Sequence, residues 1–103
     1  MTSGPTRFDP VRIQAFAGGD RALAAELTAL FIRNAALYAA SYKAASDVSG
    51  RAALLHKLKG AALTVGAERL AALCAAGEED LAADIAIGLE EEIAALRREL
   101  NIQ

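Results

Sequence analysis

Residues 55–66 read Leu55-His56-Lys57-Leu58-Lys59-Gly60-Ala61-Ala62-Leu63-Thr64-Val65-Gly66, and they include the only histidine of the chain. On a helix at about 100° per residue, the apolar residues gather on one side: Leu54, Leu58, Ala61 and Val65. His56 points from the opposite side, where its neighbours at spacings of three and four residues lack bulk close to the ring. Those neighbours are Ala52, Ala53, Lys59 and Gly60, with Leu63 beyond. The stretch therefore predicts a helix that packs on a core and presents an imidazole to solvent.

Gly60 lies inside this predicted helix, where a glycine costs about 1 kcal/mol relative to alanine. The hydrophobic pattern does not require a glycine there, so we attribute it to a requirement other than folding. Four residues after His56, the missing side chain leaves room for another molecule to reach the imidazole. Lys59, three residues after His56, can bring its ammonium group beside whatever the ring carries.

The whole chain has 103 residues, the size of one domain, and is too short for a core plus a nucleotide-binding domain. Alanine, the best helix former, dominates the apolar residues, and alternating runs of β-branched residues are missing. We therefore expect an all-α domain spanning residues 1–103, with residues 1–6 as a loose terminus.

Capping residues and apolar spacing divide the chain into helices. Asp9-Pro10, Asp20 and Ser46-Asp47 are predicted helix starts, while Gly18-Gly19 and Gly66 are predicted stops. The expected helices span residues 10–17, 20–45, 47–65 and 67–77, and a last one begins between residues 81 and 84 after a turn at 77–80. These elements predict an antiparallel up-down four-helix bundle with a short extra N-terminal helix.

The second predicted helix is apolar on two faces. One face is expected in the core, with Phe31 as an anchor: Leu23, Leu27, Leu30, Phe31, Asn34, Tyr38 and Tyr42. The reverse face consists of Ala25, Ala29, Ile32, Ala36 and Ala39. Alanine's helix propensity alone can account for that reverse face. The alternative is a docking surface on which Ile32 is the exposed apolar member.

The chemistry of His56 follows from its neutral imidazole, which is a nucleophile. Its reference pKa of about 6.5 leaves a large neutral fraction at neutral pH. It can take a phosphoryl group directly, and such transfer depends on positioning and on neutralising the equatorial oxygens. Lys59 can supply part of that charge. The sequence offers no Walker loop, no metal cluster and no paired carboxylates beside the histidine, so donor and metal must come from elsewhere.

The run His56-Lys57-Leu58-Lys59-Gly60, followed by Gly66-Ala67, resembles the signature of the histidine-containing phosphotransfer (HPt) domain. The resemblance runs from about Asp47 to Cys74. It implies a two-component phosphorelay protein that accepts a phosphoryl group on His56 from the aspartate of one receiver domain and passes it to another. Lys59 matches the lysine beside the phosphate, and Gly60 matches the glycine that opens access. Departures are Leu63, where a smaller or polar residue is common, and Gly77, where a larger apolar one is common.

The same resemblance implies the partners. Response-regulator receiver domains, and a hybrid histidine kinase as a further candidate, would dock over the helices expected at 20–45 and 47–65. The residues expected to contact them are Ile32, Ala52, Ala53, Lys57 and Leu63. The receiver brings the acidic pocket and Mg²⁺, so this chain binds no cofactor or metal of its own. It is expected to be a monomeric phosphoryl carrier rather than an enzyme.

Charge and composition narrow the other possibilities. The net charge of −2 offers no electrostatic footprint for nucleic acid, whereas Arg51, Lys57 and Lys59 near the histidine suit a partner with an acidic pocket. Cys74 matches the apolar phase of its helix and is expected to be buried. The sequence has no unbroken run of 18 apolar residues and no hydrophobic leader, so we expect a cytoplasmic protein without membrane contact.

Three other hypotheses about the function of the chain are weighed against phosphotransfer. The first is a passive helical adaptor or self-associating bundle that uses the apolar back of the second helix. The second is the phosphoacceptor domain of a sensor kinase, in which a proline commonly stands five residues after the histidine, where this chain has Ala61. The third, zinc ligation, is disfavoured because Cys74 is the only other soft ligand.

Overall fold

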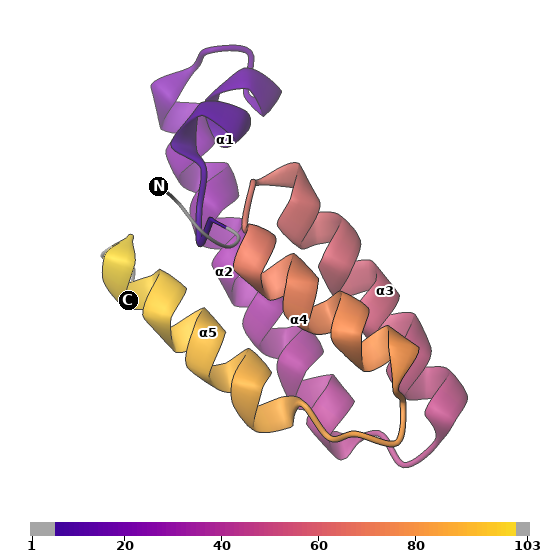
Figure 1. Cartoon of the computed structure of the whole chain (residues 1–103). Coiled ribbons are helices and arrows are strands. Elements are labelled where there is room, and N and C mark those ends of the chain that lie inside the picture. Colours follow the sequence, from indigo (N-terminus) through magenta and orange to yellow (C-terminus); the bar gives the residue numbers. More distant parts are fainter. Residues whose placement is uncertain (1–5, 101–103) are drawn as a thin grey trace, which may run out of the picture.

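The computed structural model describes residues 6–100, and within that range every regular element is an α-helix. The helices are α1 (Pro10–Phe16), α2 (Arg21–Ala44), α3 (Val48–Thr64), α4 (Glu68–Glu79) and α5 (Ala86–Glu99). Consecutive long helices reverse direction, and α2 to α5 form a ring in which each contacts the next (Figure 1). Helix α1 packs against α2 and α3 at one end. The predicted four-helix bundle with a short N-terminal helix is confirmed.

Three aspartates begin helices at the predicted places. Each carboxylate accepts a hydrogen bond from a backbone N–H of the first turn: Asp9 from Val11, Asp20 from Leu23 and Asp47 from Gly50, at 2.8–3.0 Å. Gly66 ends α3 with a φ of +75°, and a Cβ built on it would lie 2.5 Å from the Cβ of Asp9. Only glycine therefore fits the point at which α1 crosses the α3–α4 turn.

The orientation of α2 differs from the prediction. Its buried residues are Ala24, Thr28, Phe31, Ile32, Ala35, Ala39 and Tyr42. Phe31 is a core residue as expected, but Leu23 and Leu30 are more than two-fifths exposed and Asn34 is exposed as well. Ile32 is 0% exposed, so the expectation of an exposed Ile32 on a docking surface is wrong. Small alanines allow the neighbouring helices to approach α2 closely, Leu27 is partly buried against the core, and Leu23 and Leu30 remain outside.

The core stripe of α3 is also shifted. The buried residues along α3 and its C-cap are Leu55, Leu58, Ala62 and Val65. Leu54 and Ala61, which were expected in the stripe, are only partly buried against the core. The shift arises because α3 makes its most extensive contact with α4, and Leu55 faces α4 at Gly77. A Cβ on Gly77 would lie 2.9 Å from Leu55 Cδ1, so the glycine permits this close approach.

The end of α4 was also predicted incorrectly. Residues 77–79 were expected in a turn, but they form the last part of α4. The connection to α5 covers residues 80–85, and α5 begins at Ala86, slightly later than expected. Cys74 is buried in α4 as predicted, and burial raises the pKa of its thiol to about 12. Thr6, expected in a loose terminus, is bonded to α4 through its carbonyl, which accepts the Arg69 N–H at 2.9 Å; residues 1–5 lie outside the described range.

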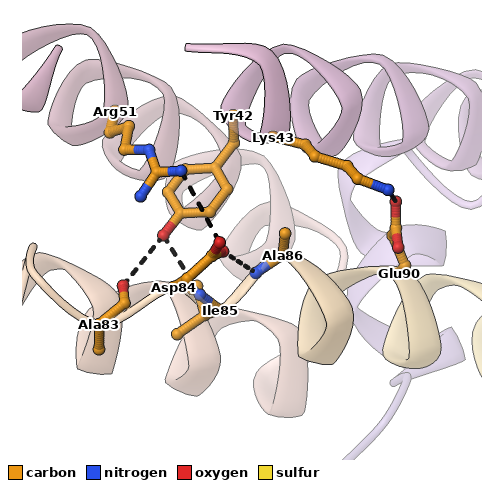
Figure 2. Close-up of polar contacts among 8 residues, drawn as sticks. All are labelled: Tyr42, Lys43, Arg51, Ala83, Asp84, Ile85, Ala86 and Glu90. Atoms are coloured by element: carbon orange, nitrogen blue, oxygen red, sulfur yellow. Dashed lines mark hydrogen bonds and ion pairs between the residues drawn. The ribbon is translucent and has the colours of Figure 1, made fainter. Parts of the chain in front are cut away.

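Tyr42 at the end of α2 holds the α4–α5 connection in place (Figure 2). Its buried hydroxyl donates to the carbonyl of Ala83 and accepts the N–H of Ile85, both at 3.3 Å. The guanidinium of Arg51 lies 4.6 Å from the centre of the Tyr42 ring, and its Nη2 lies 3.9 Å from the Asp84 carboxylate. These contacts join α2, α3 and the connection at the end of the bundle opposite α1.

By length and composition, α2 is the one described helix that could cross a membrane. In this structure one face of α2 packs in the core of the bundle against α3 and α5.

Candidate functional site

His56 lies near the middle of α3 and its side chain is 76% exposed. The ring leaves the helix on the side opposite the buried Leu58, as the spacing predicted. The imidazole is therefore accessible to a partner molecule, which is the first requirement for an acceptor of a transferred group.

Gly60, one helical turn after His56, leaves open space. Apart from its two chain neighbours and the nearby backbone of its own helix, no described heavy atom lies within 4 Å of a Cβ built at Gly60, so packing does not explain the glycine. The backbone there is ordinary helix, since Gly60 is not among the positive-φ glycines. The structure thus supports the interpretation that Gly60 is not required by the fold. Its absent side chain exposes the helix surface beside the imidazole.

The Glu78 carboxylate, which the sequence analysis did not identify, lies beside this site. Glu78 of α4 approaches the ring with Oε2 at 3.4 Å from His56 Nδ1. Its other oxygen, Oε1, lies 2.6 Å from Lys59 Nζ. The side chain is only 24% exposed, because it lies between α4 and α3. His56, Lys59 and Glu78 therefore form a connected group across two antiparallel helices.

Electrostatic attraction links Glu78 to Lys59. The hydrogen bond from the Lys59 ammonium lowers the pKa of Glu78 below its ordinary value, with partial burial opposing the shift and His56 adding a smaller lowering. Glu78 is thus an anion at neutral pH. Lys59 was expected to bring its ammonium beside a phosphoryl group on the ring, and in this structure that ammonium contacts Glu78.

Glu78 was missed because no spacing rule on α3 reaches it. It stands 22 residues after His56, and the sequence reading placed it in a turn. The available signal was the helical phase of α4: Cys74 and Gly77 face the core, which puts Glu78 at the edge of the same face. If the predicted helix had been extended to Glu79, where α4 ends, its phase would have placed Glu78 at the edge that borders α3.

Four of the five residues expected to contact a partner lie on the surface of α3, and the fifth, Ile32, is buried. Ala53 and Lys57 are exposed on the His56 side of α3, and Leu63 is 45% exposed. Ala52 is half-buried. These four share the outer surface of α3 with His56, whereas the buried Ile32 lies in the core and cannot contact a partner.

A shallow apolar groove runs between α2 and α3 beside Gly60. It is lined by Ile13, Phe16, Leu27, Leu30, Phe31, Asn34, Tyr38, Ala61, Thr64 and Val65. The Thr64 hydroxyl donates to the Gly60 carbonyl at 3.0 Å, which fixes its side chain at the groove edge. Arg12 of α1 donates to the Leu63 carbonyl at 2.9 Å, and that carbonyl, at the end of α3, also accepts the Gly66 N–H at 3.3 Å.

Within residues 6–100 there is no group of three or more His, Cys, Asp or Glu side chains that could hold a metal ion. At His56 the described residues offer an exposed nucleophilic imidazole with one carboxylate and one ammonium nearby.

A family model described as the Hpt domain matches residues 21–100. The matched range contains α2 to α5, and with them His56, Lys59, Gly60 and Glu78. It therefore supports the resemblance first recognised from residues 47–74. No curated protein and no solved structure matches the chain in the corresponding searches.

Proposed function

The chain belongs to the Hpt domain family, and its general role is histidine phosphotransfer in phosphorelay signalling; we propose that His56 is the acceptor. In this proposal His56 takes a phosphoryl group from the aspartate of one receiver domain and passes it to the aspartate of another. The chain acts as a phosphoryl carrier in the cytoplasm, and the transfer chemistry is completed by its partners.

Glu78 sets the nucleophilic nitrogen in this proposal. Its carboxylate accepts a hydrogen bond from Nδ1–H, which leaves the lone pair on Nε2, the nitrogen directed away from Glu78. Nε2 attacks phosphorus as the bond to the aspartate oxygen breaks, and the aspartate leaves as a carboxylate. The proton stays on Nδ1, and Glu78 stabilises the positive charge of the phosphorylated ring. Transfer to the next aspartate returns the electron pair to Nε2 and restores the neutral imidazole.

Lys59 supplies positive charge to the phosphoryl oxygens in this scheme. Its ammonium lies 2.6 Å from Glu78 Oε1. The added phosphoryl group competes for the ammonium, and a lysine side chain is flexible enough to reach either anion. The acidic pocket and Mg²⁺ come from the receiver domain, where the metal neutralises the transferring group.

The receiver contacts the outer surface of α3 around His56 in this proposal. Lys57 offers a charge to the acidic rim of a receiver, and Ala52, Ala53 and Leu63 offer small or apolar surface. The groove between α2 and α3 continues this surface beside Gly60. A hybrid histidine kinase would use the same face through its own receiver domain.

The observation that carries the proposal is the 76% exposed imidazole beside a glycine with open space above it. The test mixes this chain with a receiver phosphorylated on its aspartate, in the presence of Mg²⁺. We expect an acid-labile, alkali-stable phosphoryl group on His56, and none on the His56→Gln variant. Failure to label across a panel of receivers from the same cell would reject the role of His56. A passive adaptor would instead keep partner binding and cellular activity in His56→Gln.

A further inference from the structure

Three leucines form a row along the outer side of α2. Leu23, Leu30 and Leu37 are 41%, 43% and 65% exposed, and they follow one another at intervals of seven residues. We call these three residues the leucine row. The sequence analysis placed Leu23 and Leu30 in the core, but the buried residues of α2 are Ala24, Thr28, Phe31, Ile32, Ala35, Ala39 and Tyr42.

A spacing of seven residues is the repeat at which two helices pack along a common seam. Seven residues complete almost two turns of a helix, so the row stays nearly parallel to the helix axis and can face one partner helix along its length. Buried leucines at single positions of a soluble bundle do not need this regularity. The row therefore fits a straight helix as its partner better than a rounded domain surface.

The charged residues beside the leucine row indicate which partner helix would complement it. Glu26 and Arg33 flank the leucine row on one edge of α2, and both are exposed. Neither forms an ion pair with another residue of the described range, 6–100. They also lie seven residues apart, which is too far for them to pair with each other along one helix.

A second copy of α2 complements this pattern when it runs antiparallel. A two-fold axis through Leu30 places Leu23 opposite Leu37 of the second copy, because each stands seven residues from Leu30. The same axis brings Arg33, three residues after Leu30, close to Glu26 of the second copy, four residues before its Leu30. With a rise of about 1.5 Å per residue, the two side chains differ by about 1.5 Å along the axis.

The antiparallel two-fold keeps the charged edges of both helices on the same side of the interface, so the arrangement contains two such ion pairs. A parallel pairing would put the two charged edges on opposite sides and leave all four charges without partners. We propose that the leucine row is a self-association surface, through which two copies of this chain pair by an antiparallel α2–α2 contact with Arg33 of each beside Glu26 of the other. The monomer expected from the sequence is then the low-concentration state. The proposal does not rest on phosphotransfer. Because Leu30 also lines the groove between α2 and α3, a dimer and a receiver would compete for that part of α2.

Sedimentation equilibrium over a wide concentration range tests the pairing. We expect the wild-type chain to form dimers as its concentration rises. Leu37→Glu should raise the dimer dissociation constant at least about a hundredfold, because two charges would enter the seam. Ile87→Glu is the matched control, since Ile87 is 69% exposed on α5, away from the row, and should leave the dimer unchanged.

Charge reversal tests the geometry. Arg33→Glu alone and Glu26→Arg alone should each weaken the dimer by about two- to fivefold per ion pair lost. The double variant should recover wild-type association, because the pairs form again with reversed sign. At protein concentrations low enough for the wild type to be monomeric, the unfolding curves of all variants should coincide, since these side chains are exposed.

A chain that stays monomeric up to its solubility limit would overturn the proposal. Equal effects of Leu37→Glu and Ile87→Glu, or a double reversal that recovers nothing, would do the same. Loss of receiver binding in Leu37→Glu without any dimer in the wild type would assign the row to the receiver instead. His56→Gln should dimerise normally, so failure of the phosphotransfer proposal is distinguishable from failure of this one.

Discussion

If Gly60 gives a receiver access to His56 as proposed, folding and phosphoryl transfer make opposite demands on this position. Nothing among the neighbouring groups lies within 4 Å of a Cβ built there, so alanine meets no obstacle and gains helix propensity. We expect Gly60→Ala to raise the free energy of unfolding by up to about 1 kcal/mol, as measured by urea denaturation. Gly60→Leu should slow phosphoryl transfer from a receiver far more than it changes stability.

Ser49→Leu is the control for Gly60→Leu. Ser49 is exposed and lies seven residues before His56 on the same side of α3, so it adds the same bulk two turns away. Transfer to this variant should remain close to that of the wild type. If Gly60→Leu instead loses stability and transfer rate in equal measure, Gly60 is a folding residue.

The Glu78 carboxylate should make stability depend on pH. Because the folded chain lowers the pKa of Glu78, its contribution is fully present above the unfolded-state value of about 4.3 and disappears as pH falls through the lower folded-state value. We expect Glu78→Gln to be less stable than wild type at neutral pH. The two free energies of unfolding should converge in acid, as measured by urea denaturation at a series of pH values.

Glu79→Gln provides the comparison for this titration, since Glu79 is the exposed neighbour of Glu78 and forms no ion pair in the described range, 6–100. Its stability difference from wild type at neutral pH should stay small, because the side chain is exposed. A constant gap between wild type and Glu78→Gln down to strong acid would show that the interaction with Lys59 contributes nothing through charge.

The sequence predicted the positions of some residues of the site but not of others. His56, Lys59 and Gly60 lie within one turn of a single helix, so helical spacing alone predicted their shared exposed surface. Glu78 reaches the same imidazole from α4, and its position depends on how two helices are offset along their axes. That offset is set by close packing at Gly77 and by the length of α4, neither of which a local pattern reveals.

At the scale of single elements, α2 shows where side-chain size misleads. The reading assigned the leucines to the core because burial of large apolar side chains usually dominates stability. Both faces of α2 are apolar, however, and the bundle uses Ala24, Ala35 and Ala39 to bring helices close together. Caps and helix starts were predicted well because they depend on one or two local residues. Helix rotation depends on all neighbours at once.

A pair of truncations on α2 measures that rotation. Ile32→Ala should cost about 2–5 kcal/mol of unfolding free energy, because its side chain is 0% exposed in the core. Leu37→Ala should change it by no more than about 0.5 kcal/mol, because that side chain is 65% exposed. Chemical denaturation at low protein concentration avoids any contribution from self-association. Similar losses in both variants would place α2 in a different rotation.

At the scale of the whole molecule, Thr6 and Arg7, which precede α1, connect α4 with α5. Of the neighbouring pairs in the ring of four long helices, α4 and α5 make the least extensive contact. Thr6 bonds α4 through the Arg69 N–H, and Arg7 reaches α5, where its Nε lies 3.1 Å from Glu92. The Glu92 side chain is only 10% exposed, so this charge-assisted hydrogen bond is largely shielded from water.

Replacing Arg7 with methionine should therefore destabilise the bundle by about 1–3 kcal/mol, because a nearly buried carboxylate loses a charged donor. Glu99→Gln removes the second partner of Arg7, at 3.7 Å and 48% exposed, and should cost no more than about 0.5 kcal/mol. Thermal and urea unfolding give both values, and Arg7→Met combined with Glu92→Gln should recover part of the loss since the remaining side chain is neutral. If Arg7→Met costs no more than Glu99→Gln, the segment does not brace α4 against α5, and the core alone determines how the bundle closes.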